Sequence, residues 1–270
     1  MISRFVGRVL AVVALTATAL CLGWAVAPGS PLFALVLTPH RMFVLSLFSK
    51  LLSLLLASLW SYAVVRRFET DNPARPAWCL LGLGMLATLI GQLCLAPEQI
   101  VSGSSPFPSV ADLFFVLSYP FLAVSFVVFL RAYQQSGLPL GSRGERLTIL
   151  GALAVVAMVL AVVVVKPVLI APTPLLERAL NAFYPIADLV LLLPLALLFR
   201  VTTRMRGGQI GRVWSILLSG FVFMCAADVF YAFYSNLGLA GFDPWLHAAF
   251  ILAYWLVAAG VKRQLRLLSE

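Results

Sequence analysis

The chain has 270 residues, of which 62% are hydrophobic and 11% are charged, and its mean hydropathy is +1.03. A soluble domain carries roughly 25% charged residues, so the composition excludes a water-soluble globular protein and predicts an all-α bundle surrounded by membrane lipids. The net charge of +9 does not indicate nucleic-acid binding, because the basic residues lie in short segments between apolar runs.

Apolar runs of the length that crosses a bilayer predict eight transmembrane helices. Their approximate ranges are 9–27, 42–64, 77–96, 109–130, 147–165, 180–199, 213–235 and 244–261. Proline ends or begins helices, and prolines stand at many of the predicted junctions: Pro28, Pro39, Pro76, Pro97, Pro108, Pro167 and Pro244. No stretch is long and polar enough for a separate soluble domain, so we expect one integral membrane domain.

The first predicted span has two interpretations. Arg4 and Arg8 precede an apolar stretch that ends in Ala25-Val26-Ala27, which resembles the cleavage site of a secretory signal peptide. The stretch is longer than the usual apolar core of a signal peptide, and Pro28 would directly follow the cut. We therefore favour an uncleaved helix.

The basic residues predict the orientation of the bundle. Every second loop and both termini together hold fifteen of the 19 basic residues: Arg4, Arg8, Arg66, Arg67, Arg75, Arg131, Arg143, Arg146, Arg200, Arg204, Arg206, Arg212, Lys262, Arg263 and Arg266. Because basic loops stay in the cytoplasm, both termini are predicted to be cytoplasmic. The pattern is typical of a multi-pass protein of the bacterial inner membrane.

Ionisable residues inside the predicted spans are the strongest candidates for a site, because a charge near the bilayer centre costs about 2.5–3.5 kcal/mol. Lys50, Asp188 and Asp228 each lie roughly 10–12 Å below the predicted outer surface, at 1.5 Å per residue, and Asp112 lies nearer the edge. Opposite charges at one depth are expected to attract each other. Ser46, Ser49, Ser53 and Ser61 continue a polar stripe with Lys50 at helical spacing.

The residues predicted to line an outer-half ligand pocket are Lys50, Gln92, Asp112, Tyr119, Tyr184, Asp188, Asp228, Tyr231 and His247, and Asn181 and Tyr254 can add to it. A structural ion-pair network that holds the helices together is the alternative. Three acids against one base leave room for a proton, a cationic ligand or an ion. We expect no metal and no cofactor, because His40 and His247 lack further ligands at a suitable spacing.

Other conspicuous residues have structural explanations. Five tryptophans near span ends are expected to form belts at the lipid headgroups: Trp24, Trp60, Trp78, Trp214 and Trp245. Gly82, Gly84 and Gly91 are expected to allow close helix packing. The four cysteines are expected to be free thiols. The chain has no GxSxG, P-loop or HExxH motif, so an enzyme is not the favoured interpretation.

Three short segments resemble one another, and one resembles a known family. Ala-Asp recurs at 111–112, 187–188 and 227–228. The run Pro108-Ser109-Val110-Ala111-Asp112, continued to Tyr119-Pro120, resembles the "PSxADxxYLxxYP" stretch in the multispanning N-terminal membrane regions of bacterial diguanylate cyclases, phosphodiesterases and histidine kinases. Tyr184-Pro185, Asp228, Trp255 and Gly260 extend the resemblance over residues 77–262.

The resemblance implies a membrane sensor region, although no catalytic module follows the last helix in this sequence. We therefore predict a sensory module that takes up a small ligand, ion or lipid from the outer face and passes the signal to a cytoplasmic partner. One alternative is a transporter or proton-coupled carrier, because intramembrane acids and lysines are common in such proteins. A membrane-embedded lipid enzyme and a structural subunit of a membrane complex are further alternatives.

Overall fold

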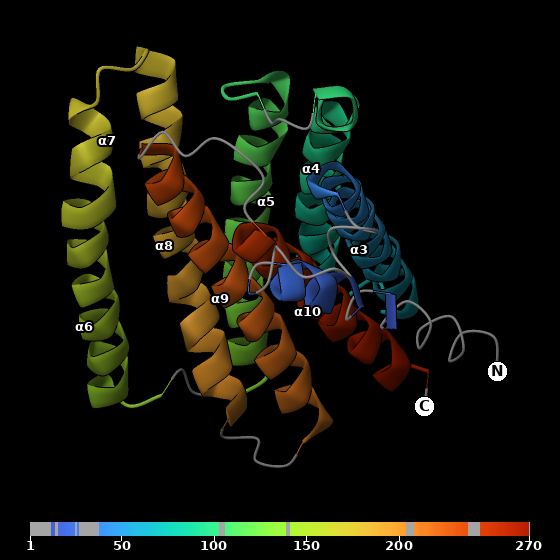
Figure 1. Ribbon diagram of the computed structural model, residues 1–270. Coiled ribbons are helices and arrows are strands. Elements are labelled where there is room, and N and C mark those ends of the chain that lie inside the picture. The colour runs from blue at the N-terminus through green and yellow to red at the C-terminus, as the bar shows by residue number, and fades with distance from the viewer. Residues whose placement is uncertain are drawn as a thin grey trace.

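Figure 1 shows the computed structural model, which describes residues 12–13, 16–24, 26, 38–102, 106–138, 141–203, 208–236 and 244–269. All elements in these ranges are helices. They are α3 (Pro39–Arg67), α4 (Arg75–Ser102), α5 (Val110–Gln135), α6 (Arg143–Leu160), the π-helix η1 (Ala161–Val165), α7 (Lys166–Ile170), α8 (Leu175–Thr203), α9 (Gln209–Asn236) and α10 (Pro244–Leu267).

Seven membrane-length helices are found in the described ranges, with α6, η1 and α7 forming one of them. This confirms the all-helical fold, and seven of the eight predicted spans coincide with helices long and apolar enough to cross a membrane. The helices extend beyond most of the predicted ranges; α8, for example, runs from 175 to 203 instead of 180 to 199. The first predicted span, 9–27, lies partly outside the described residues. Its described helical residues include Ala17 and Cys21, which pack against Met42, Ile251 and Trp255.

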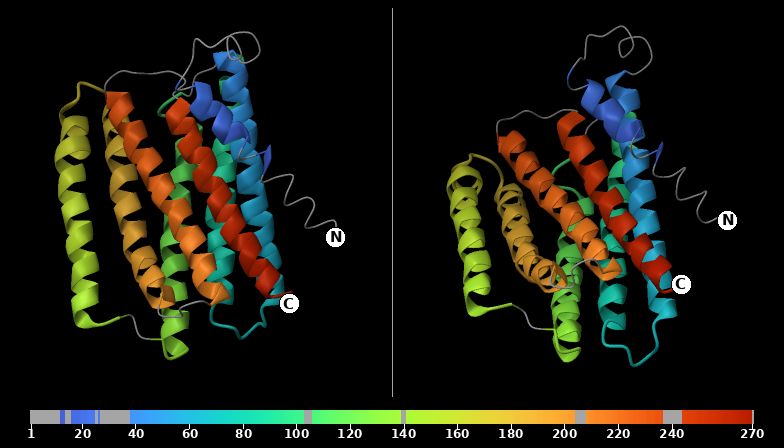
Figure 2. Two further views of the ribbon diagram at one scale, coloured as in Figure 1. Left: turned by 60° about the horizontal axis from the view of Figure 1, so that its bottom comes forward. Right: turned by 90° about the horizontal axis from the view of Figure 1, so that it is seen from below.

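Six of the helices form a closed ring. Going round it, α3 packs on α4, α4 on α5, α5 on α8, α8 on α9, α9 on α10, and α10 returns to α3. The helix of α6, η1 and α7 stands outside the ring against α8, as Figure 2 shows in both views. In its most apolar window 6% of the residues are buried, so lipid is its natural surrounding.

Local sequence signals explain where several helices begin. The Thr38 side chain accepts from the backbone N–H of Arg41 at the start of α3. Ser109 and Asp112 form a reciprocal capping box at the start of α5, and Ser142 and Glu145 do so for α6. Such caps satisfy backbone N–H groups that the first turn leaves unpaired.

Two prolines do not end helices as predicted. Pro97 lies inside α4, which continues to Ser102. Pro167 follows the wide π-helical turn of η1, and the helix continues to Ile170. Proline removes one backbone hydrogen bond, and membrane helices accommodate this through local adjustment and neighbouring groups. In α4 the extra turn after Pro97 carries the buried Gln99 into the bundle.

The basic ends of the helices gather on one face of the bundle. Arg200 at the end of α8 forms an ion pair with Glu145 at the start of α6. Lys262 near the end of α10 lies 4.6 Å from the ring centre of Trp60 near the end of α3. We call this end the basic face. Its assignment to the cytoplasm stays a prediction.

An apolar core fills the ring beside the basic face. Trp78 and Trp214 are 2% and 1% exposed, so the prediction that they belong to a headgroup belt is wrong. Both rings pack edge-on against Phe129, and Trp214 Nε1 donates to the Tyr133 hydroxyl at 2.5 Å. Span ends that face the bundle interior need large apolar side chains to close it, and sequence position alone does not distinguish these ends from lipid-facing ones.

Glycines permit close helix packing, as predicted for α4. A Cβ at Gly91 would lie 2.5 Å from Phe115, and one at Gly84 would lie 2.7 Å from Leu122. Gly220 of α9 has the least adaptable surroundings, because its Cβ would lie 3.0 Å from the Ala253 carbonyl and from the Val257 nitrogen of α10.

We expect Gly220→Leu to lower stability by about 1–3 kcal/mol, because backbone atoms of α10 cannot move aside as a side chain can. Gly151→Leu is the matched control, since a Cβ there meets nothing within 4 Å. Thermal unfolding in detergent should show a lower midpoint for Gly220→Leu alone. Equal midpoints for both variants would contradict this packing.

Candidate functional site

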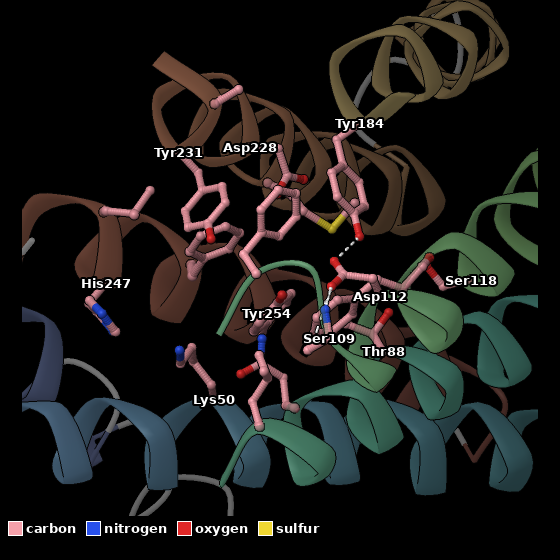
Figure 3. Close-up of a pocket in the computed structure, with 18 of the residues that line it drawn as sticks. Lys50, Thr88, Ser109, Asp112, Ser118, Tyr184, Asp228, Tyr231, His247 and Tyr254 are labelled. Atoms are coloured by element: carbon pink, nitrogen blue, oxygen red, sulfur yellow. Dashed lines mark hydrogen bonds between the residues drawn. The ribbon is translucent and has the colours of Figure 1, made fainter. Parts of the chain in front are cut away.

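A cavity of about 140 Å³ lies inside the six-helix ring, and all six helices contribute to its wall. It occupies the end of the bundle opposite the basic face, because its residues lie late in α4 and α9 and early in α5, α8 and α10. Eight of the nine predicted site residues line it: Lys50, Gln92, Asp112, Tyr119, Tyr184, Asp228, Tyr231 and His247. Figure 3 shows most of them directed into one space.

Asp188 is the ninth predicted site residue, and it does not line the cavity. Its side chain is 1% exposed and lies behind the wall. The Tyr119 hydroxyl, which does line the cavity, donates to Asp188 Oδ1 at 3.0 Å. Asp188 therefore reaches the cavity only through Tyr119, and its second carboxylate oxygen has no hydrogen-bond partner.

Tyr119 also joins the two deepest carboxyl groups of the site. Its hydroxyl oxygen lies 3.0 Å from Asp188 Oδ1 and 3.5 Å from Asp228 Oδ2. A phenol has one proton to donate, so the shorter contact takes it and Asp228 is left weakly bonded. Asp228 is partly exposed, and it borders the cavity. Among the acids of this site, Asp228 has the most hydrogen-bonding positions left for a ligand.

Asp112 is bonded on both carboxylate oxygens. The Tyr184 hydroxyl donates to Oδ1 at 2.6 Å (Figure 3), and the Ser109 backbone N–H donates to Oδ2 at 2.7 Å. The second bond belongs to the capping box of α5. The Pro-Ser-x-Ala-Asp sequence thus has a local structural role, and it also fixes a carboxylate and a tyrosine in the wall.

Lys50 and His247 form the opposite part of the wall. Lys50 of α3 is 4% exposed, and His247 of α10 is 8% exposed. The Ser46 hydroxyl oxygen lies 2.8 Å from the Phe43 carbonyl and 2.8 Å from His247 Nδ1, and it is hydrogen-bonded to both. The bond with His247 fixes the orientation of the imidazole ring at the cavity.

The predicted attraction between Lys50 and the acids does not produce an ion pair. No described residue forms a salt bridge or a side-chain hydrogen bond with Lys50. The reason is geometric, because α3 packs on α4 and α10 and lies across the cavity from α8 and α9. Figure 3 shows Lys50 and Asp228 on opposite sides of the cavity. A structural ion-pair network would need a contact between Lys50 and one of the acids, and the described residues make no such contact.

The polar stripe predicted for α3 is buried. Ser46, Ser49, Ser53 and Ser61 are each 0% exposed. Ser49 also accepts from Trp255 Nε1 at 3.4 Å, which links α3 to α10. Helical spacing of small polar residues therefore located an interhelical face correctly.

Sequence reasoning missed part of the wall. Thr88 and Phe107 line the cavity, and neither was predicted. Thr88 lies one helical turn before Gln92, so extending the spacing argument along α4 would have found it. Phe107 precedes α5 and lies outside every predicted span, and no periodic signal marks such a residue.

Comparison of this chain with protein-family models, with curated proteins and with solved structures finds no match. The resemblance to membrane regions of signalling proteins therefore stays a prediction, and the function must be argued from the cavity.

Proposed function

We propose that this chain is a sensory module of the bacterial inner membrane that binds a small polar ligand from the outer face and signals to a cytoplasmic partner. The observation that carries the proposal is the cavity inside the helix ring, with Lys50 in its wall and no ion-pair partner for Lys50 among the described residues. A buried charge without a partner is costly, so proteins keep one where it has a use. A ligand that contacts Lys50 supplies that use.

The apolar core favours a receptor over a transporter. Between the cavity and the basic face, the ring is filled by side chains such as Leu54, Phe126, Leu195 and Phe221, each 0% exposed. Transported ions and solutes need a polar path or broken helices at mid-membrane. The packed apolar layer contains no polar path by which a ligand could pass from the cavity to the basic face.

Two helices connect the cavity to the basic face. Helix α3 carries Lys50 into the cavity wall and Trp60 toward the basic face, and α10 carries His247 and Lys262 in the same way. Lys262 and Trp60 are in contact at the basic end. A ligand that binds two arrangements of α3 and α10 differently would shift the basic face, which a cytoplasmic partner could read.

The orientation can be tested by chemical labelling. In a variant without the four native cysteines, we expect Thr173→Cys, in the loop between α7 and α8, to react with an impermeant maleimide in intact cells once the outer membrane is opened. Asp71→Cys, in the loop between α3 and α4, should react only after the inner membrane is permeabilised. The reverse pattern would place the cavity on the cytoplasmic side.

Ligand binding can be tested with the purified protein in detergent. Thermal-shift screening should use small amines, carboxylic acids, amino acids, polyols and inorganic ions. We expect at least one compound class to raise the unfolding midpoint of the natural chain and to lose its effect in Asp228→Asn. Asp71→Asn, in an exposed loop, is the matched control. If no compound shifts the midpoint, the sensory proposal fails. Uptake of a binding compound into proteoliposomes would favour the transporter instead.

A further inference from the structure

The cavity has two poles of opposite charge. Lys50 of α3 forms the cationic pole, and His247 of α10 lies on the same side. Asp228 of α9 and Asp112 of α5 belong to the other, and Asp188 stands behind it. In Figure 3, Lys50 and His247 lie along one side of the space, and Asp228 lies across from them. A molecule in this space therefore meets a cation at one end and carboxylates at the other.

Each pole has a charged side chain that makes few hydrogen bonds or ion pairs with the described residues. Lys50 has no ion-pair partner among the described residues, and Asp228 receives only the 3.5 Å contact from Tyr119. Gln92 and Asn181 also line the cavity, and each has a side-chain carbonyl oxygen without a hydrogen-bond partner. Both side chains are more than nine-tenths buried. Native proteins rarely bury so many unsatisfied groups unless something else completes them.

Aromatic rings surround the acidic pole. Tyr119, Tyr184 and Tyr231 line the cavity together with Phe107 and Phe115. Tyr119 and Tyr184 have ring centres 6.1 Å apart, and Phe107 and Tyr231 have ring centres 6.0 Å apart. Aromatic faces beside a carboxylate are the usual surroundings for an ammonium group, especially an alkylated one. The acidic pole therefore suits the cationic end of a ligand.

The size of the cavity limits the ligand. Its volume of about 140 Å³ is close to that of a cavity that accepts benzene, about 150 Å³. A peptide, a nucleotide or a lipid headgroup with its glycerol is too large to lie wholly within it. The space suits a molecule with one charged group at each end of a short apolar body.

We propose that the ligand is a small zwitterion of the amino-acid or betaine class. Its carboxylate contacts Lys50, and its ammonium group lies beside Asp228 among the tyrosines. This inference rests on the sensory function proposed above and names the chemistry of its ligand. A simple amine would leave Lys50 unpaired and close to a second cation, and a simple carboxylate would face Asp228, so each would leave one buried charge uncompensated.

Isosteric compounds test the charge requirement directly. Glycine betaine has both charges, 3,3-dimethylbutyrate replaces its ammonium nitrogen with carbon, and choline replaces its carboxylate with a hydroxymethyl group. A second series is 4-aminobutyrate with butyrate and butylamine. Isothermal titration of the purified natural chain should show binding of at least one zwitterion, with both of its singly charged relatives at least tenfold weaker.

Two variants then assign the poles. Lys50→Met should weaken the zwitterion at least tenfold and remove its advantage over the cationic relative. Asp228→Asn should weaken it similarly and remove its advantage over the anionic relative. Lys166→Met and Asp71→Asn, both at exposed positions, are the matched controls and should bind as the natural chain does. Lys50→Gln provides a second test of that pole if the methionine variant does not fold.

The outcomes separate this inference from the sensory proposal. If a singly charged relative binds as tightly as the zwitterion, or if neither variant changes zwitterion binding, the zwitterion assignment is wrong. If other compounds in the wider screen bind and depend on Asp228 while no zwitterion does, this inference fails and the sensory function stands. If nothing in either experiment binds, both fail.

Discussion

Lys50→Met is expected to raise the thermal stability of the protein while it weakens ligand binding at least tenfold. Lys50 is 4% exposed, and its ammonium group has no ion-pair partner in the described part of the chain. Burying an unpaired charge is unfavourable, and methionine fills a similar volume without one. We expect a gain of about 1–3 kcal/mol without ligand, measured as a higher unfolding midpoint in detergent.

A stabilising loss of function is the mark of a residue kept for binding. Lys166→Met is the control, because Lys166 is exposed near the beginning of α7 and its replacement should change stability by less than about 0.5 kcal/mol. If Lys50→Met instead lowers the midpoint, then Lys50 has a structural partner. The unpaired Lys50 would then no longer distinguish the cavity from a packing defect.

The sequence predicted the candidate site better than it predicted the helix boundaries. Lys50, Asp228 and Tyr184 could be found because a polar residue inside an apolar run is rare, and helical spacing shows which neighbours share its face. Their predicted depths placed Lys50, Asp188 and Asp228 at the same level of the bundle. Depth does not determine the angle around the bundle, so it could not show that Lys50 lies across the cavity from Asp228.

Other features depended on packing that no local pattern encodes. Trp78 and Trp214 occupy span ends as headgroup residues do, yet they pack inside the ring. The helix of α6 is apolar all round, and nothing in such a run tells whether it is central or peripheral. Pro97 interrupts the hydrogen-bond pattern of α4 without ending it. In each case the structure depends on which helix packs beside the residue, and the local sequence does not specify this.

Tyr119→Phe is expected to cost about 1–3 kcal/mol of stability, because it removes the hydroxyl that donates to Asp188 and makes the longer contact with Asp228. Asp188 Oδ2 already lacks a partner, so the change leaves the whole carboxyl group unsatisfied. Tyr62→Phe, at an exposed position, should change stability by less than about 0.5 kcal/mol.

A double-mutant cycle with Asp188→Asn separates this hydrogen bond from a general loss of packing. If the bond is the cause, removing the hydroxyl should cost much less in the Asp188→Asn background, with a coupling energy of about 0.5–3 kcal/mol. Additive losses would show that Tyr119 acts only as an aromatic ring in the wall. A measured coupling would confirm the hydrogen bond that links the buried Asp188 to the cavity wall.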